Sequence, residues 1–140
     1  MPAICGHFLW KEKMTEIKVL STNNAPAAIG PYVQGKIVNG LLFASGQIPL
    51  DPKTGLLAEE SIEAQARQAL NNVKALVEAA GSSLDKVVKT TCFLKNISDF
   101  AEFNKVYAEF FKEVPPARSC VGNIDLPKGA LCEIEVVAAV

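Results

Sequence analysis

Two short apolar segments carry the charged side chains that are best placed for chemistry. Arg118 and Cys120 lie two positions apart in 117–121, so on a strand their side chains share one face, with Ser119 opposite. A guanidinium among prolines, alanine and valine needs an anion, because burying it without a partner is costly. The anion is either a structural carboxylate or the carboxylate of a ligand. Spacing alone favours the structural salt bridge, by about two to one.

The second segment is 132–140, in which Glu133 and Glu135 share a strand face among apolar neighbours. Burial raises the pKa of a carboxyl group there, and a nearby arginine lowers it. An Arg–Glu pair around a cleft can therefore be tuned for proton transfer near neutral pH. The alternative is that both glutamates are edge or interface charges, which we favour for Glu135.

Nucleophilic and metal chemistry have little support. The only histidine is His7, so Cys120 has no histidine in the body of the chain to activate it as a nucleophile. No C-x-x-C spacing is present, which makes a zinc site hard to assemble. We expect Cys92 and Cys132 to be small core residues. The residues thus favour neither metal nor cysteine-nucleophile catalysis, and we expect the reaction to use no cofactor.

The composition predicts one globular domain without a strong overall charge. A chain of 140 residues with 49% hydrophobic and 21% charged side chains can bury a core. Its net charge of −1 gives no overall field that attracts a polyanion, so nucleic-acid binding would need a local basic patch. No apolar run approaches the roughly 20 residues that span a bilayer, and the cysteine pattern favours the cytoplasm or an organelle matrix. We expect residues 1–13 to be a poorly ordered appended or alternative-start segment, and residues 14–140 to form the domain.

Apolar periodicity predicts two helices. In 61–80 apolar residues recur at three- and four-residue steps, and Gly81 stands where a helix-ending glycine belongs. Ser98 or Asp99 can cap a second helix that runs to Phe111. Its aromatic stripe is interpreted as core rather than as a platform for a ligand.

Runs of β-branched and aromatic residues predict the strands. Asn39-Gly40 tolerates the positive φ angles of a type I′ turn, so 33–38 and 41–45 form a hairpin whose second strand continues toward Leu50. Further strands are expected at 17–20, 87–94, 117–121 and 131–140. This order favours an α+β fold in which one sheet has both helices on one face. The other face is then apolar and uncovered, so we predict an oligomer.

Several of these segments carry longer motifs: NAPAAIGPY at 24–32, ASGQIP at 44–49, VKTT at 88–91, PARSCV at 116–121 and LPKGALCEIE at 126–135. Together they resemble the Rid family, also called YjgF, and within it the RidA group of 2-iminobutanoate/2-iminopropanoate deaminases. The resemblance covers residues 17–140. One departure is the stretch 122–125, which lacks the glutamate and the basic residue expected after the arginine motif. We expect this departure to affect substrate breadth rather than reaction type.

The resemblance implies a chorismate-mutase-like α+β fold, one mixed β-sheet with two helices on one face, and a trimer with a central β-barrel. Active sites would lie in clefts between subunits. It implies that Arg118 binds the carboxylate of a small 2-imino acid and that Glu133, not Glu135, positions the hydrolytic water. The residues at the other pocket positions of the family are Tyr32, Ser45, Gly46, Asn104 and Cys120, of which we group Cys120 with the catalytic pair.

Two other functions remain open. Some members of the family are credited with endoribonuclease or translation-inhibitor activity, although this chain shows no basic stripe and no histidine pair for RNA cleavage. A chaperone-like binder would instead hold unfolded clients on its exposed apolar surface, which requires no pocket.

Overall fold

The helices and strands follow the apolar periodicity of the sequence. The computed structural model describes residues 15–140, and the segment 1–13, for which we expect poor order, lies outside them. The helices are α1 (Ile62–Ala79) and α2 (Phe100–Phe110), and the strands are β1 (Ile17–Leu20), β2 (Gly35–Val38), β3 (Leu41–Ala44), β4 (Val87–Leu94), β5 (Ala117–Val121) and β6 (Cys132–Ala139). Short 3-10 helices lie at Leu84–Lys86, Ile97–Asp99 and Pro127–Gly129.

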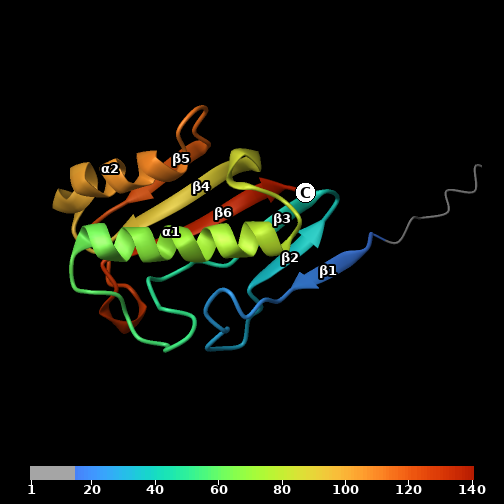
Figure 1. Cartoon of the computed structure of the whole chain (residues 1–140), viewed down its shortest axis with the longest axis horizontal. Helices are drawn as coiled ribbons and strands as arrows, with labels where there is room; N and C mark the ends of the chain where they lie inside the picture. Colours follow the sequence, from blue (N-terminus) through green and yellow to red (C-terminus); the bar gives the residue numbers. More distant parts are fainter. Residues whose placement is uncertain (1–14) are drawn as a thin grey trace, which may run out of the picture.

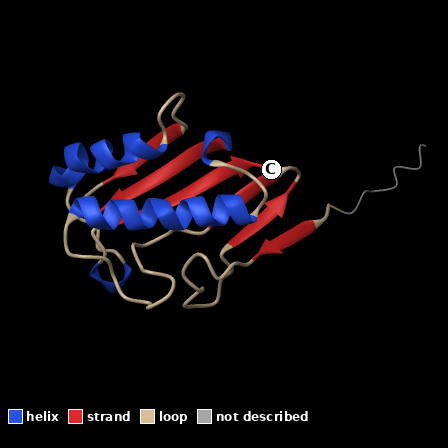
Figure 2. Ribbon diagram, in the orientation of Figure 1, coloured by secondary structure: helices blue, strands red, loops and turns tan. Residues whose placement is uncertain are grey.

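The six strands of residues 15–140 form one mixed sheet in the order β1-β2-β3-β6-β4-β5. Neighbouring strands are antiparallel except β4 and β5, which are parallel because α2 carries the chain back between them. Figures 1 and 2 show that α1 and α2 lie in front of the same face of this sheet. The structure thus confirms the expected α+β fold with both helices on one face.

Helix α1 begins and ends where its sequence signals stand. The Ser61 hydroxyl oxygen accepts a hydrogen bond from the Ala64 N–H at 3.1 Å, which caps the first turn. Gly81 follows the helix with a φ angle of 80°, a left-handed conformation that glycine adopts without steric cost. None of the helices described in 15–140 has the length and apolar character needed to cross a bilayer.

The predicted hairpin turn is confirmed, whereas its predicted long second strand is wrong. Asn39 and Gly40 have φ angles of 51° and 75°, as a type I′ turn requires. Strand β3 ends at Ala44, and pairing with β6 resumes only at an isolated bridge between Gln47 and Ile134.

One extra residue interrupts this pairing. Phe43 pairs with Val137 and Gln47 pairs with Ile134, so four steps along one segment match three steps along the other. This is a β-bulge, which bends the strand and re-aims the side chains around it. The bulge falls in the stretch that contains two of the predicted site residues.

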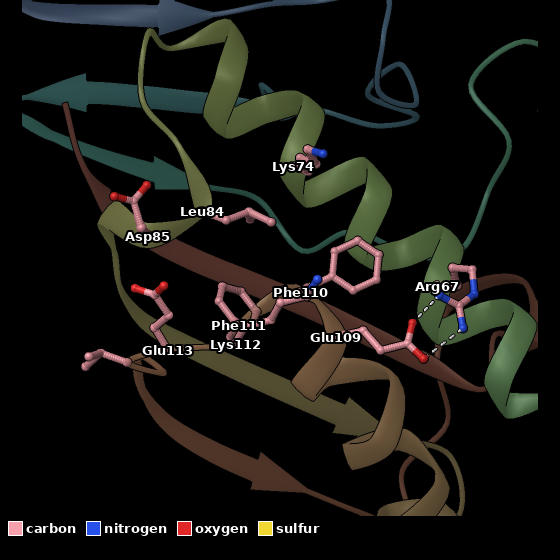
Figure 3. A pocket seen from close by; sticks show the side chains of 10 residues that line it. Arg67, Lys74, Leu84, Asp85, Glu109, Phe110, Phe111, Lys112 and Glu113 are labelled. Atoms are coloured by element: carbon pink, nitrogen blue, oxygen red, sulfur yellow. Dashed lines mark hydrogen bonds and ion pairs between the residues drawn. The ribbon is translucent and has the colours of Figure 1, made fainter.

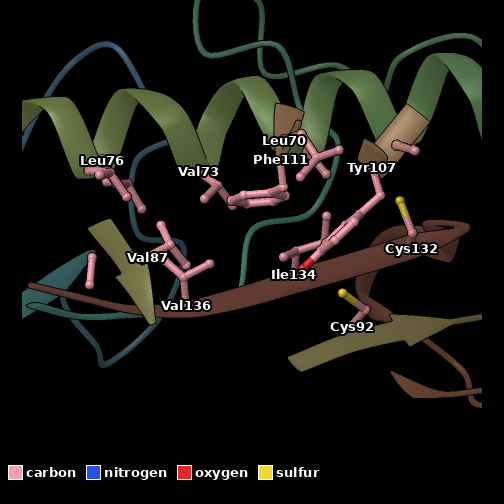
Figure 4. Close-up of a cluster of buried hydrophobic side chains, with 14 of the residues drawn as sticks. Leu70, Val73, Leu76, Val87, Cys92, Tyr107, Phe111, Cys132, Ile134 and Val136 are labelled. Carbon is pink, nitrogen blue, oxygen red and sulfur yellow. The ribbon is translucent and has the colours of Figure 1, made fainter. Parts of the chain in front are cut away.

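The pairing register assigns each side chain to one of the two sheet faces. Cys92, Ile134 and Val136 face the helices and are buried in the core that Figure 4 shows. The opposite face, here called the open face, carries apolar side chains that no helix covers. Val19 and Phe43 on this face are 60% and 46% exposed. The uncovered apolar face predicted from the sequence is therefore present in the single chain.

Candidate active site

Arg118 lies on β5 against one row of side chains on α2. Phe100, Asn104 and Tyr107 are four and three residues apart, so they stand above one another on the same helix face. Arg118 Nη1 donates a hydrogen bond to Asn104 Oδ1 at 2.8 Å. The guanidinium carbon lies 5.3 Å from the centre of the Phe100 ring and 4.7 Å from that of Tyr107, within the range of cation–π attraction.

No carboxylate of residues 15–140 forms an ion pair with Arg118. The structural salt bridge that spacing favours is therefore wrong for this part of the chain. The physical reason is the direction of the side chain, which is turned toward the aromatic and amide groups of α2. These groups hold the guanidinium in place without neutralising its charge, so Arg118 can still receive an anionic ligand.

Cys120 shares the face of Arg118, as its spacing predicts. The two lie beside Cys92 and Thr90 of β4, while Ser119 points to the open face, where its hydroxyl oxygen accepts a hydrogen bond from Lys89 Nζ at 3.0 Å. Burial raises the pKa of the Cys120 thiol, and the Arg118 charge only partly offsets this effect. The thiol is thus not activated as a nucleophile within the chain.

Cys92 and Cys132 are core residues, as predicted. Both are fully buried, and their thiols are free. Burial raises the pKa of each to about 12, so neither thiol ionises near neutral pH.

Glu133 lies on the open face, where β6 pairs it with Phe93 of β4. Its side chain is half-buried, and its pKa is raised by desolvation and, to a smaller extent, by the charge of Glu135. The carboxylate lies against Gly46, in the bulged stretch. A Cβ atom at Gly46 would overlap Glu133 Oε1 and would lie 2.9 Å from Glu133 Cδ. The bulge and the missing side chain together make room for this carboxylate.

Tyr32 and Ser45 line a groove of about 760 Å³, to which β6 contributes Glu135 rather than Glu133. Ser45 Oγ donates a hydrogen bond to the Val33 carbonyl oxygen at 2.6 Å, which fixes its hydroxyl at the groove wall. Tyr32 is 48% exposed as a residue, and its hydroxyl oxygen accepts a hydrogen bond from the Ile29 N–H at 3.3 Å. Both predicted pocket residues thus lie in the groove that Glu135 lines, and Gly46, which follows Ser45 in the chain, links this groove to the Glu133 carboxylate.

The predicted site residues therefore fall into two groups. We call Tyr32, Ser45, Gly46 and Glu133 the acid half-site, and Asn104, Arg118 and Cys120 the arginine half-site. The sheet register separates them, because paired residues share a face: Arg118 pairs with Thr90, Glu133 pairs with Phe93, and positions 90 and 93 of β4 point to opposite faces. Within one chain, Arg118 and Glu133 cannot face the same cleft.

Sequence reasoning missed Phe100 and Tyr107 as contacts of Arg118. It interpreted the aromatic stripe of α2 as core, and Phe103, Val106 and Tyr107 are indeed buried. Phe100, however, is 37% exposed, and Tyr107 serves both the core and Arg118. The spacing of Asn104 from the two aromatic residues was the signal that could have found this row.

A separate groove of about 690 Å³ lies between α1 and the end of α2 (Figure 3). Arg67 and Glu109 close one end of it with an ion pair in which Nη1 and Oε2 are 2.5 Å apart. Both side chains are largely exposed, so this pair contributes little to stability. The groove contains none of the predicted site residues, and its charges are of both signs, which gives no preference for one class of ligand.

The chain is similar to known proteins over most of its length. Residues 22–140 match a family model described as Endoribonuclease L-PSP. A 2-iminobutanoate/2-iminopropanoate deaminase of Salmonella typhimurium is 55% identical over 124 residues, which cover 86% of this chain and 96% of the relative.

Solved structures share the fold. A Yersinia pestis protein, YyfA, described as a protein of unknown function of the conserved Rid protein family, is 52% identical with a TM-score of 0.87, covering 89% of this chain and 100% of that chain. Escherichia coli TdcF, solved with bound serine, is 45% identical with a TM-score of 0.84, covering 88% of this chain and 98% of that chain.

Proposed function

This chain belongs to the Rid family, and we propose that it hydrolyses small 2-imino acids, such as 2-iminobutanoate and 2-iminopropanoate, to 2-oxo acids and ammonia. The observation that carries the proposal is the guanidinium of Arg118, which is held by Asn104 and two aromatic rings and has no carboxylate partner in the described chain. Such a group suits the carboxylate of a substrate. We place the activity in the cytoplasm, where it would remove reactive imines.

Arg118 would bind the substrate carboxylate with charge-assisted hydrogen bonds, each worth about 1.5–3 kcal/mol. This anchor would fix the adjacent imine carbon relative to the attacking water. Two relatives support the assignment. The Salmonella protein is named as a deaminase of such imino acids, and TdcF was solved with serine, which also carries a carboxylate beside a nitrogen-bearing carbon.

Glu133 would transfer both protons of the reaction. As water attacks the imine carbon, Glu133 accepts a water proton and passes it to the imine nitrogen, which gives a carbinolamine. It then moves the hydroxyl proton to the nitrogen, the C–N bond breaks, and ammonia leaves the 2-oxo acid. One water is consumed, and Glu133 returns to its starting form. A pKa raised by desolvation supports this role, because such a carboxylate holds a proton more readily near neutral pH.

The complete site would form between two copies of the chain. Because the acid and arginine half-sites lie on opposite faces of one sheet, each would need the other half-site from a neighbour. A trimer with its open faces turned inward, around a central barrel, would also cover the exposed Val19 and Phe43. Cys120 and Tyr32 would contribute to the walls of the cleft.

The test compares three variants on 2-iminopropanoate that is generated enzymatically in the assay. Arg118→Ala and Glu133→Gln are each expected to lower the rate above spontaneous hydrolysis about 100-fold, since one anchors the substrate and the other transfers protons. Glu135→Gln changes a carboxylate two residues away on the same face and is expected to lose far less. Wild-type rates in both Arg118→Ala and Glu133→Gln would contradict the proposal.

The same preparations distinguish the two other functions. The matching family model is described as an endoribonuclease, so RNA is incubated with each variant. RNA cleavage that persists in Arg118→Ala and Glu133→Gln, together with a wild type that does not accelerate imine hydrolysis, would favour the ribonuclease. Protection of an unfolded client by both variants, again without deaminase activity in the wild type, would favour a chaperone-like binder.

A further inference from the structure

We propose that Tyr107, held in place by Thr90, is a positioning residue for Arg118. The inference rests on the proposed function in one respect, namely that Arg118 binds the carboxylate of the ligand. Tyr107 would not touch the substrate. It would set the position of the guanidinium through the face of its ring and leave the N–H groups of Arg118 free for the ligand.

The ring of Tyr107 is fixed from several sides. The residue is 6% exposed, and its ring centre lies 5.9 Å from that of Phe103 and 4.7 Å from that of Phe111, both in tilted arrangements. Figure 4 shows the side chain reaching from α2 into the buried cluster above β4 and β6. A ring held in this way has little freedom, so the guanidinium above it is held to one position.

Thr90 fixes the other end of the same side chain. Its hydroxyl and that of Tyr107 are joined by a hydrogen bond of 2.8 Å, and Thr90 is fully buried. Burial raises the pKa of Tyr107, so the phenol stays protonated and can keep this hydrogen bond. Thr90 is also the residue of β4 that pairs with Arg118. The hydrogen bond therefore ties the ring to the strand position beside the arginine that it supports.

An aromatic support differs from a carboxylate in a way that matters for binding. A carboxylate would hold Arg118 by occupying its N–H donors and cancelling its charge. A ring attracts the cation through its face and occupies no N–H group. The neutral amide oxygen of Asn104 accepts a hydrogen bond from a single N–H group of Arg118. Phe100 contacts the guanidinium from a greater distance and is partly exposed, so Tyr107 is the better fixed of the two rings.

The experiment measures binding of pyruvate, the 2-oxo acid product, by NMR titration of the full-length protein, together with KM for 2-iminopropanoate. Tyr107→Leu is expected to weaken pyruvate binding and raise KM by about 3- to 30-fold, the range of a cation–π contact. In an Arg118→Ala background, the same substitution is expected to change binding less than about twofold, because nothing remains for the ring to position. Phe110→Leu, on the same helix but without a contact to Arg118, is the matched control and should bind pyruvate as the wild type does.

A second pair of variants covers the case in which Tyr107→Leu does not fold. Thr90→Val removes the hydroxyl that holds the phenol, and Tyr107→Phe keeps the ring, so each is expected to weaken binding less than loss of the ring. Wild-type pyruvate binding in Tyr107→Leu, or in both Thr90→Val and Tyr107→Phe, would overturn the inference. A wild type that binds pyruvate through Arg118 but does not hydrolyse imines would instead refute the proposed function and leave the positioning role supported.

Discussion

Gly46 determines where the Glu133 carboxylate can lie. The carboxylate occupies the space that a side chain at Gly46 would fill. This contact distinguishes Glu133 from Glu135, which shares its face but is exposed. Alternation along a strand places both glutamates on one face but does not reveal which of them lies against a neighbouring backbone. For the same reason, the prediction of a structural salt bridge at Arg118 was wrong. The spacing of residues within one strand does not show which residues of other elements contact it.

Gly46→Ala is expected to lower deaminase activity about 100-fold while reducing the free energy of unfolding by only about 1 kcal/mol. The new methyl group displaces the end of a flexible side chain, which costs little stability but moves the carboxylate to which we assign the proton transfers. Gly55→Ala is the reverse control, since Gly55 has a φ angle of 71° with no atom near a Cβ. It should lose about 1–2 kcal/mol and keep full activity. Rates and denaturant melts of both variants are compared, and wild-type activity in Gly46→Ala would rule out this placement of Glu133.

The pH dependence of stability provides a second test at Glu133. Its pKa is raised in the folded chain by desolvation and by the charge of Glu135. As the pH rises, the Glu133 carboxyl group therefore ionises at a lower pH in the unfolded chain than in the folded one. The wild type therefore loses stability as the pH rises from about 4, the ordinary value for glutamate, through the raised folded pKa. Glu133→Gln lacks this loss, so it should equal the wild type in acid and exceed it at neutral pH. Melts from pH 3 to pH 8 measure the difference, and a Glu133→Gln variant that is less stable only at neutral pH would refute the sign.

Helix α2 shows how one element can serve both core and site. Its row of Phe100, Asn104 and Tyr107 holds Arg118 with one amide and two rings. Helical periodicity predicts that these residues share a face. It does not reveal that this face contacts an arginine as well as apolar core residues. That information lies in the parallel pairing of β4 with β5, which is a long-range contact.

Asn104→Asp is expected to weaken pyruvate binding about tenfold or more, because the new carboxylate would pair with Arg118 and compete with the ligand. Asn104→Ala removes the amide without adding a charge and is expected to lose less. The aspartate variant should also recover part of its binding as the pH falls and the new carboxyl group becomes protonated. Titrations at two pH values measure this, and an aspartate variant that binds no worse than the alanine variant would contradict the role given to the uncompensated charge.

Local sequence signals predicted the elements well where local chemistry decides them. The Asn39-Gly40 turn, the end of α1 at Gly81 and the limits of β4 and β5 all agree with the structure. The predicted extension of the second hairpin strand toward Leu50 was wrong, because a β-bulge interrupts the pairing after Ala44. Such a bulge depends on the register of a partner strand some ninety residues away in the sequence. The residues of this stretch alone do not show which of them is left unpaired.

At the scale of the whole molecule, the sheet divides the site. The sequence motifs named residues of both half-sites, and the register shows that Arg118 and Glu133 lie on opposite faces. Composition and pattern predicted an apolar face in need of a cover, and the structure exposes that face in the single chain. We therefore expect neither half-site to act alone, and assembly to be a condition of catalysis rather than a source of stability only.

The most direct measurement is complementation between two inactive variants. Arg118→Ala and Glu133→Gln chains are co-expressed in equal amounts so that they form mixed assemblies, which we expect to be trimers. A site is intact when Arg118 comes from one variant and Glu133 from the other, which random assembly gives for about a quarter of the sites. We expect about a quarter of wild-type deaminase activity, and none when Arg118→Ala is paired with the double variant Arg118→Ala/Glu133→Gln. Mixed trimers no more active than the two parents would contradict a site shared between chains.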